Sequence, residues 1–254
     1  VGSEMCIRDR VITAKNPLPF ITGTICAHHC MDKCMRNHYE CPVNIRGTKL
    51  QAAEGAFEEL LAITEMSREG EKVAIIGGGP AGLAAAYHAQ KHGLQATVFE
   101  KRETLGGIVR NVIPGFRIGD DAIDNDIALI KKTGAEFVMG KEAPDVKELK
   151  AMGFDYVVLA CGAEKKGRLN IEGNVMNVID FLYAFKNGGE LKLGRNVAVV
   201  GGGNVAMDAA RCARRQKNIP ACALSTLTPT PTSGTTTWGP SSATPVCCAA
   251  ATSW

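Results

Sequence analysis

The sequence predicts an α/β protein in which short parallel strands alternate with helices, preceded by a small helical domain. A strand, a glycine-rich turn and a helix follow one another twice, near residues 73–91 and 197–215. In front of the first strand, apolar residues recur at helical spacing and form one stripe: Leu50, Ala53, Phe57, Leu60 and Leu61. We therefore expect a Rossmann-like α/β fold behind a helical domain.

Composition excludes several classes of protein. The chain has 254 residues, 45% hydrophobic and 22% charged, which is ordinary for a globular protein. A formal net charge of +3 is too small to argue for a nucleic-acid partner. No apolar run approaches the roughly 20 residues that a membrane span needs. Residues 1–10 lack the apolar core of a signal peptide.

The positions of the ten cysteines argue against a disulfide scaffold. Cys26, Cys30 and Cys34 form one tight group, and the middle of the chain holds only Cys161 and Cys212. This distribution suits a reducing cytoplasm with one local metal site.

Five parts are expected along the chain. Residues 1–10 have no periodicity and are expected to be a non-native leader. Residues 11–68 are helical, residues 69–192 form the first strand-and-helix domain, and residues 193–217 begin a second. Within the first of these domains we expect a helix stopped by Gly134 and, in FDYVVLACGA, a buried strand.

The last part, residues 218–254, has a different composition. It contains no Asp, Glu, Lys or Arg, which has odds of roughly one in ten thousand at the charge content of the chain. It is rich in Thr, Pro, Ser and Ala without a period, so no packed structure is expected. An out-of-frame reading is the leading hypothesis, and a natural linker is the alternative.

The first glycine turn has the pattern of a dinucleotide site. The strand Val73–Ile76 precedes Gly77, Gly79 and Gly82, and the helix Leu83–Lys91 follows. In G-x-G-x-x-G the first glycine permits the tight turn, the second lets a pyrophosphate approach, and the third lets the helix pack closely. The phosphates then lie at the helix N-terminus.

An acidic residue completes this pattern. The next strand, Ala96–Phe99, ends at Glu100, where a carboxylate can accept hydrogen bonds from ribose hydroxyls. A glycine turn that binds nothing is the alternative. We expect the following residues to bind the first dinucleotide: Gly77, Gly79, Pro80, Ala81, Gly82, Glu100, Lys101, Gly107 and Gly162.

The second glycine turn repeats the design after the strand Val197–Val200. Its pattern is G-x-G-x-x-A, so the chain is expected to bind two dinucleotides. The acid or arginines that would separate NAD from NADP are missing, because the unusual tail occupies their place. The expected binding residues are Gly201, Gly203, Asn204, Val205 and Ala206.

The cysteine group reads C-x3-C-x3-C. On a helix, residues four apart share a face, so the thiols of Cys26, Cys30 and Cys34 are expected to point one way. Thiolates on one side suit an iron–sulfur cluster or zinc, although three ligands are one short of four. The alternatives are a zinc site completed by His28, His29 or His38, and thiols that are merely buried.

Two segments resemble the glutamate synthase small-subunit family. The first is GGGPAGLAAA with VFEKRETLGGIVRNVIPGFR, and the second is NPLPFITGTICAHHCMDKCMRNHYECPVNIRGTKLQAAE. The family includes the N-terminal part of dihydropyrimidine dehydrogenase, and the chain is most similar to its selenate-reductase-like iron–sulfur subunits. The resemblance implies FAD in the first site, NADPH (or NADH) in the second, and [4Fe–4S] clusters that Cys26, Cys30 and Cys34 share with upstream cysteines.

This resemblance implies an electron-transfer oxidoreductase. Reducing equivalents would pass from NAD(P)H through FAD and 4Fe–4S clusters to a partner subunit or domain, with no catalytic side chain required. The sequence departs from the family at Cys161, where Thr is usual, and lacks the C-terminal segment that completes the family's FAD site. Two alternatives stay open: a zinc-stabilised nucleotide-binding interaction module, and an inactive truncated fragment.

Overall fold

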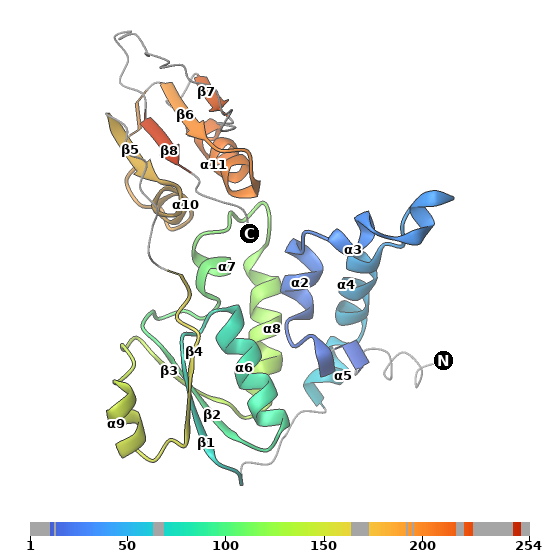
Figure 1. The fold of residues 1–254 in the computed structure, drawn as a ribbon, viewed down its shortest axis with the longest axis vertical. Helices are drawn as coiled ribbons and strands as arrows, with labels where there is room; N and C mark the ends of the chain where they lie inside the picture. Colours follow the sequence, from blue (N-terminus) through green and yellow to red (C-terminus); the bar gives the residue numbers. More distant parts are fainter. Residues whose placement is uncertain are drawn as a thin grey trace, which may run out of the picture. The chain divides into compact units, whose positions relative to one another are not determined.

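The computed structural model describes residues 11–12, 14–62, 69–163, 173–191, 193–194, 196–216, 221–225 and 246–249 (Figure 1). The chain divides into two compact units. The first contains residues 1–110 and 115–162, and the second contains residues 111–114 and 163–254. Among the described residues, no helix is long and apolar enough to cross a membrane.

A parallel sheet of four strands forms the centre of the first unit. It consists of β1 (Lys72–Ile76), β2 (Gln95–Glu100), β3 (Glu136–Met139) and β4 (Tyr156–Leu159), in the order β3-β2-β1-β4. Every neighbouring pair is parallel. This confirms the α/β class and both strands that the sequence predicted around the first glycine turn.

Four helices connect these strands. They are α6 (Pro80–Lys91) after β1, α7 (Gly107–Asn111) and α8 (Asp120–Lys132) after β2, and α9 (Val146–Ala151) after β3. The chain therefore runs outward from β1 to β3 and then returns to pair β4 with the other side of β1. The strand order reverses between β1 and β4, and open α/β sheets bind ligands beyond the carboxyl ends of the strands at such a point.

Helix α8 ends where the sequence predicted. Thr133 is its C-cap, and Gly134 follows with a φ of +90°. A left-handed residue after the C-cap is a common helix stop, and glycine adopts it without a steric cost.

The prediction of a buried strand in FDYVVLACGA is wrong in one respect. The strand forms, as β4, but it lies at the edge of the sheet and its side chains are largely exposed. Leu159 is 70% exposed and Tyr156 is 49% exposed. Apolar composition gives a strand, but only the strand order decides whether it is central or at an edge.

The N-terminal helices pack on the first unit. They are α2 (Pro19–Ile25), α3 (His29–Asp32), α4 (Ile45–Gly55) and α5 (Phe57–Ala62), with the 3₁₀ helix η1 (Met35–His38). The predicted apolar stripe lies in one cluster, although the chain interrupts the helix at Ala56. Besides the stripe, that cluster contains Phe20, Ala56, Ala122 and Leu129. Because two of these residues belong to α8, the helical segment is part of the first unit.

The second unit has its own parallel sheet, in the order β5-β8-β6-β7. In chain order its elements are β5 (Asn174–Asn177), α10 (Val178–Lys186), β6 (Asn196–Val200), α11 (Asn204–Arg214), β7 (Ala221–Ser225) and β8 (Val246–Ala249). Phe181, Val199 and Ala209 are fully buried in its core. Burial raises the pKa of the neighbouring Cys212 thiol to about 12, so this cysteine stays protonated.

Two expectations about this unit differ from the structure. The predicted boundary between residues 192 and 193 is displaced, because β5 pairs with β8 and therefore belongs to the second sheet. No packed structure was expected after Lys217, but β7 and β8 both pair with β6. Of these two strands β8 lies inside the sheet, where a short segment of small and apolar residues needs no alternating pattern, whereas β7 is at the edge. The rest of the tail, and the expected leader at residues 1–10, lie outside the described residues.

A buried carboxylate joins α8 to α2. Asp126 is fully buried, its Oδ1 accepts a hydrogen bond from the Phe20 amide (3.0 Å), and its Oδ2 accepts one from the Ile21 amide (2.7 Å). Burial raises the pKa of Asp126 to about 7, and the two amides oppose that shift. The carboxyl therefore ionises inside the protein only near neutral pH.

Gly82→Ala should destabilise the first unit. A Cβ at this position would lie 1.8 Å from the carbonyl oxygen of Gly77, so α6 and the turn would have to separate. We expect the free energy of unfolding to fall by about 2 kcal/mol or more, measured by urea denaturation. Gly115→Ala is the control, since its Cβ would meet no atom within 4 Å. Equal stability of the two variants would contradict this account of the turn.

The free energy of unfolding should depend on the ionisation of Asp126. Its folded-state pKa of about 7 lies above the ordinary 3.8, so between these values the folded chain binds more protons and loses stability as the pH rises. From pH 5 to pH 8, the wild type should lose about 1–3 kcal/mol relative to Asp126→Asn. Urea titrations at both pH values measure this, with the exposed Asp121→Asn as control. A wild type that gains stability relative to Asp126→Asn would show that the carboxylate is stabilised when buried.

Candidate functional site

The turn after β1 needs two of its glycines for reasons internal to the protein. Gly77 has a φ of +112°, and a Cβ there would lie 2.4 Å from the carbonyl oxygen of Ala160 at the end of β4. Its amide donates a hydrogen bond to the Phe99 carbonyl of β2 (2.8 Å). The Cβ of a larger residue at Gly82 would meet the Gly77 carbonyl. Gly77 thus makes the tight turn and Gly82 the close approach of α6 that the sequence predicted, and the structure adds that β2 and β4 meet the same turn.

Gly79 has no such internal reason. Its φ of −77° and ψ of −178° suit any residue, and an added Cβ would make only an ordinary contact, 3.8 Å from the Cα of Gly107. Gly79 is the N-cap of α6, and no side chain caps that helix, which continues with Pro80 and the exposed Ala81. The open backbone and uncapped helix N-terminus form the space that a pyrophosphate needs.

The carboxylate of Glu100 is held in a fixed orientation beside this turn. The side chain is 7% exposed; Oε2 accepts a hydrogen bond from the Gly78 amide (2.7 Å), and Oε1 accepts one from the Arg102 amide (3.0 Å). Each carboxylate oxygen can accept a further hydrogen bond. Glu100 can therefore still receive ribose hydroxyls, and the exposed Lys101 follows it.

A second glycine-rich loop lies against the first. The Gly106 amide donates a hydrogen bond to the Gly78 carbonyl (2.9 Å). A Cβ at Gly107, where φ is +53°, would lie 2.8 Å from the Cα of Gly79. The structure thus brings Gly107 to the turn, while Gly162, with a φ of +77°, follows β4 at the same edge of the sheet.

Sequence reasoning missed two residues of this site. Gly78 donates its amide to Glu100, and a Cβ there would lie 2.6 Å from a methyl carbon of Leu105. Arg110 donates a hydrogen bond from Nε to the Leu105 carbonyl (2.7 Å) and pairs with Asp120 and Asp124 of α8. The run of three glycines could have indicated that Gly78 also belongs to the turn. The partners of Arg110 could not be found in this way, because they are brought together only by the tertiary fold.

The second glycine turn has the same local geometry. Gly201 has a φ of +134°, and Gly203 is the uncapped N-cap of α11 with φ −81° and ψ 175°. A Cβ at Gly203 would meet no atom within 4 Å, so this backbone is also open. Ala206 is fully buried where the first turn has Gly82. Asn204 is exposed and Val205 is half-buried at the same helix end.

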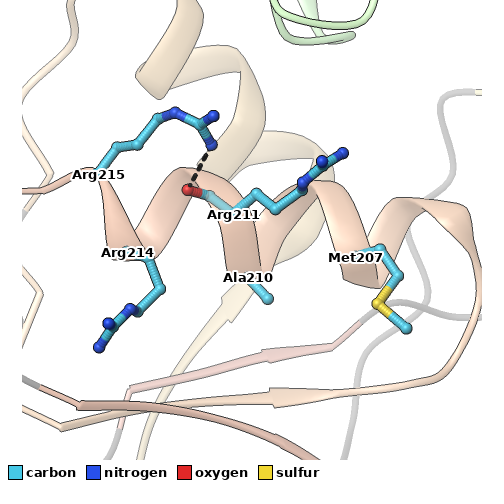
Figure 2. Close-up of a pocket in the computed structure, with 5 residues that line it drawn as sticks. All are labelled: Met207, Ala210, Arg211, Arg214 and Arg215. Atoms are coloured by element: carbon cyan, nitrogen blue, oxygen red, sulfur yellow. Dashed lines mark hydrogen bonds between the residues drawn. The ribbon is translucent and has the colours of Figure 1, made fainter.

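A hollow of about 680 Å³ lies along α11 (Figure 2). It is lined by Met207, Ala210, Arg211, Arg214 and Arg215, and Arg215 donates a hydrogen bond to the Arg211 carbonyl (3.0 Å). At 1.5 Å per residue, Arg214 lies about 16 Å along the helix from Gly203. The hollow thus extends from Met207, whose amide donates a hydrogen bond to the Gly203 carbonyl, to the C-terminal end of the helix, where cations also stabilise the helix dipole.

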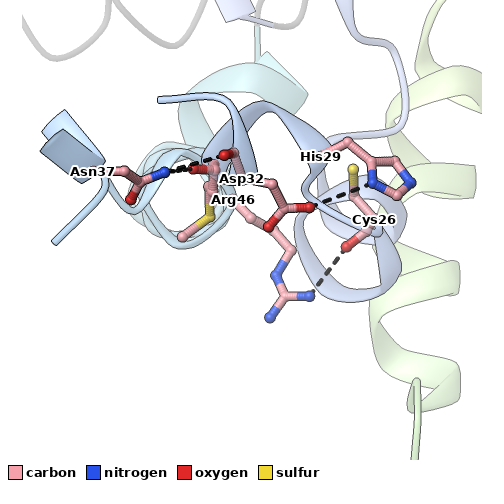
Figure 3. Close-up of polar contacts among 6 residues, drawn as sticks. Cys26, His29, Asp32, Asn37 and Arg46 are labelled. Carbon is pink, nitrogen blue, oxygen red and sulfur yellow. Dashed lines mark hydrogen bonds and ion pairs between the residues drawn. The ribbon is translucent and has the colours of Figure 1, made fainter. Parts of the chain in front are cut away.

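The three cysteines do not share one helix face, contrary to the prediction. Cys26 is the C-cap of α2, Cys30 lies in the short α3, and Cys34 precedes η1. His28 interrupts the helix, because it has a left-handed φ of +49°. The Cys26 carbonyl accepts a hydrogen bond from Arg46 (3.1 Å), and His29 pairs with Asp32 (3.5 Å) (Figure 3).

The cysteine segment, residues 26–34, contains two unusual polar groups. Backbone hydrogen bonds from Val43 and then Arg36 lower the pKa of the Cys34 thiol. Nδ1 of His28 is buried without a hydrogen-bond partner. Nevertheless, among the described residues no three His, Cys, Asp or Glu side chains gather as metal ligands would. As arranged, these residues do not by themselves fit a four-ligand metal site.

Comparison with known proteins gives a family match over the whole first sheet and over β5 and β6 of the second. A family model described as pyridine nucleotide-disulphide oxidoreductase matches residues 71–221. YgfK of Escherichia coli (strain K12), a protein named as an oxidoreductase, is 41% identical over 217 residues, which are 82% of this chain and 21% of that protein.

Two further relatives are subunits by name. The beta subunit of the Geobacter sulfurreducens NADPH-Fe(3+) oxidoreductase (strain DL-1 / KN400) is 33% identical, over 81% of this chain and 33% of its own length. The NADPH glutamate synthase small chain of Bacillus subtilis (strain 168) is 32% identical, over 80% of this chain and 45% of its own length. The chain thus spans less than half the length of the curated relatives it matches.

A solved structure supports the fold. A 2-naphthoyl-CoA reductase, in a complex with 2-naphthoyl-CoA, aligns with a TM-score of 0.52 and 25% identity. The alignment covers 69% of this chain and 26% of the reductase.

Proposed function

Because the chain belongs to the pyridine nucleotide-disulphide oxidoreductase family, we propose that it is the FAD- and NAD(P)H-binding part of an electron-transfer oxidoreductase. Family membership confirms the resemblance seen in the sequence, since the glutamate synthase small chain is among the relatives. The chain covers only part of these relatives, so its substrate and acceptor remain part of the proposal.

The open backbone at Gly79 is the observation that carries this proposal. No atom of the described residues requires a glycine there, whereas a pyrophosphate approaching the N-terminus of α6 does. Glu100 lies beside that space with its carboxylate oriented by Gly78 and Arg102. These residues fit the adenosine diphosphate part of FAD: Gly79, Pro80 and Ala81 for the phosphates, and Glu100 for the ribose.

When bound, FAD would supply the ability to accept a hydride and release electrons singly. The chain's own residues would bind and orient the cofactor. Gly107 would let the loop pass close to the dinucleotide, and Lys101 and Gly162 would line the same edge of the sheet. No side chain of the described residues needs to act as a nucleophile or a general base for this role.

For the second unit we propose a nicotinamide dinucleotide. The open backbone at Gly203 repeats the situation at Gly79, with Asn204 and Val205 in the first turn of α11. The names of the glutamate synthase and NADPH-Fe(3+) oxidoreductase relatives favour NADPH over NADH. An electron-accepting partner subunit or domain is proposed because both relatives are named as parts of larger enzymes.

We also propose that Cys26, Cys30 and Cys34 ligate a [4Fe–4S] cluster together with ligands from outside the cysteine segment. The family resemblance and the three-thiol spacing support this, and amide hydrogen bonds already favour the thiolate of Cys34. The second candidate is a zinc-stabilised nucleotide-binding interaction module without turnover. The buried and unpartnered Nδ1 of His28 favours it, because zinc accepts imidazole with thiolates.

Gly79→Ala tests the FAD site. The substitution should leave the stability of the cofactor-free chain within about 0.5 kcal/mol of the wild type, because its Cβ meets only ordinary contacts. FAD binding, measured by fluorescence titration, should weaken at least tenfold, because the methyl group occupies the phosphate approach. Gly115→Ala, in open space away from the turn, is the matched control. Unchanged FAD affinity in Gly79→Ala would remove the main support for the proposal.

Anaerobic purification distinguishes the candidate functions. We expect a chain with flavin absorption bands, with iron and acid-labile sulfide accompanying a broad shoulder if the cysteines ligate a cluster. Replacing Cys34 by Ser should abolish that shoulder and leave the flavin bands, whereas Cys161→Ser should change neither. A colourless zinc protein favours the interaction module, and a colourless protein without metal indicates an inactive fragment.

A further inference from the structure

Helix α8 connects α2, which leads into the cysteine segment, with the loop beside the first glycine turn, and polar contacts anchor it near its middle and in its N-terminal half. Near its middle, Asp126 accepts hydrogen bonds from the amides of Phe20 and Ile21 in the first turn of α2. Helix α2 is only seven residues long and ends at Cys26. The carboxylate thus binds the beginning of the helix whose C-cap is the first of the three cysteines.

Arg110 anchors the N-terminal half of α8. Its side chain is 17% exposed and pairs with Asp120 and Asp124 of that half. The same side chain donates to the Leu105 carbonyl (2.7 Å). The next residue, Gly106, donates its amide to the carbonyl of Gly78 in the first glycine turn. A short series of hydrogen bonds and ion pairs therefore runs from the turn to α8.

We propose that α8 is a strut: it fixes the position of the cysteine segment relative to the proposed FAD site at the first glycine turn. Asp126 and Arg110 are its two positioning residues. Neither residue has been assigned a role by the glycine or cysteine motifs. Both lie in the first unit, as do the turn and the cysteines. That the strut sets the position of a cluster relative to FAD rests on the proposed function. That it holds the cysteine segment at a fixed distance from the first glycine turn does not.

The carboxylate at position 126 indicates that Asp126 orients α2 on α8 and does not merely attach the two helices to each other. The apolar cluster around Phe20 and Leu129 already attaches the helical segment to α8. A buried carboxyl costs free energy that an apolar side chain would not. The carboxylate adds a directional contact. Its two hydrogen bonds, at 2.7 and 3.0 Å, specify the orientation of α2 on α8, whereas apolar contacts are not directional.

The other attachments of α2 are consistent with this division of roles. Gly23 lets α2 pack closely on α4, since a Cβ there would lie 2.9 Å from the Cβ of Leu50. That contact joins two helices of the same N-terminal segment and does not involve α8. The polar contacts described between α2 and α8 are the two hydrogen bonds of Asp126.

A distance measurement tests the strut without any cofactor. Nitroxide amino acids would be introduced by stop-codon suppression at Lys33, exposed in the cysteine segment, and at Ile108, 47% exposed next to Gly107. Pulsed electron paramagnetic resonance then gives the distribution of distances between the labels in the full chain. We expect a narrow distribution in the wild type and one at least twofold wider in Asp126→Asn.

Asp126→Asn replaces one acceptor oxygen by an amide group that cannot receive the second α2 amide, and it keeps the size of the side chain. Asp121→Asn, on the same helix but exposed, is the matched control and should leave the distribution unchanged. Arg110→Gln, which breaks the other anchor, should also widen it and carries the test if Asp126→Asn fails to fold.

An unchanged width in a folded Asp126→Asn or in Arg110→Gln would overturn the strut. Equal widening in Asp121→Asn would overturn it too, because any perturbation of α8 would then suffice. Loss of FAD binding in Gly79→Ala does not depend on these distances, so failure of the proposed function and failure of the strut are separately visible. A residue that only stabilises the fold would lower the melting temperature without changing the distance distribution of the folded chain.

Discussion

The approach of helix α6 to the end of β1 constrains the rest of the first unit. At Gly82 a single methyl group would meet the carbonyl oxygen of Gly77, so nothing larger than a hydrogen atom fits between helix and strand. This proximity directs the free amides of α6 toward the carboxyl edge of the sheet, where the strand order reverses. Glu100, the loop at Gly106 and the end of β4 are then all within reach of the turn.

Both units place a helix N-terminus at the end of a strand, but the helix and the strand approach less closely in the second unit. The first turn has glycine at its third motif position, and the second has the buried Ala206. An alanine is accommodated only if helix and strand stand slightly further apart, so the second unit does not have the extreme contact of the first. Both turns nevertheless keep an unconstrained glycine at the helix N-cap, Gly79 and Gly203. A glycine that neither conformation nor packing requires is best explained by something outside the protein that approaches it.

Local patterns predicted what depends on neighbours in the sequence. The strands and helices around both turns, the end of α8 at Gly134 and the apolar stripe from Leu50 to Leu61 follow from spacing within a dozen residues. The edge position of β4 and the membership of β5 in the second sheet follow from strand order, which spacing does not encode. The same limit applies to Arg110 and Asp126, whose partners lie at 5 to 14 and at 105 to 106 residues in the sequence.

The cysteine segment shows the limit most clearly. Spacing of four residues predicts a shared helix face only if a helix is present, and the left-handed His28 divides this segment into short pieces. Ligand geometry at a thiolate site is coupled to metal binding, so sequence spacing specifies which thiols are available and not how they converge. Asp126 is a constraint of another kind, since it acts on the first turn of α2, which ends at Cys26, and not on how the three thiols converge. The hydrogen bonds of Asp126 therefore act on where the segment begins, and the convergence of its thiols depends on the ligands and the metal that complete the set.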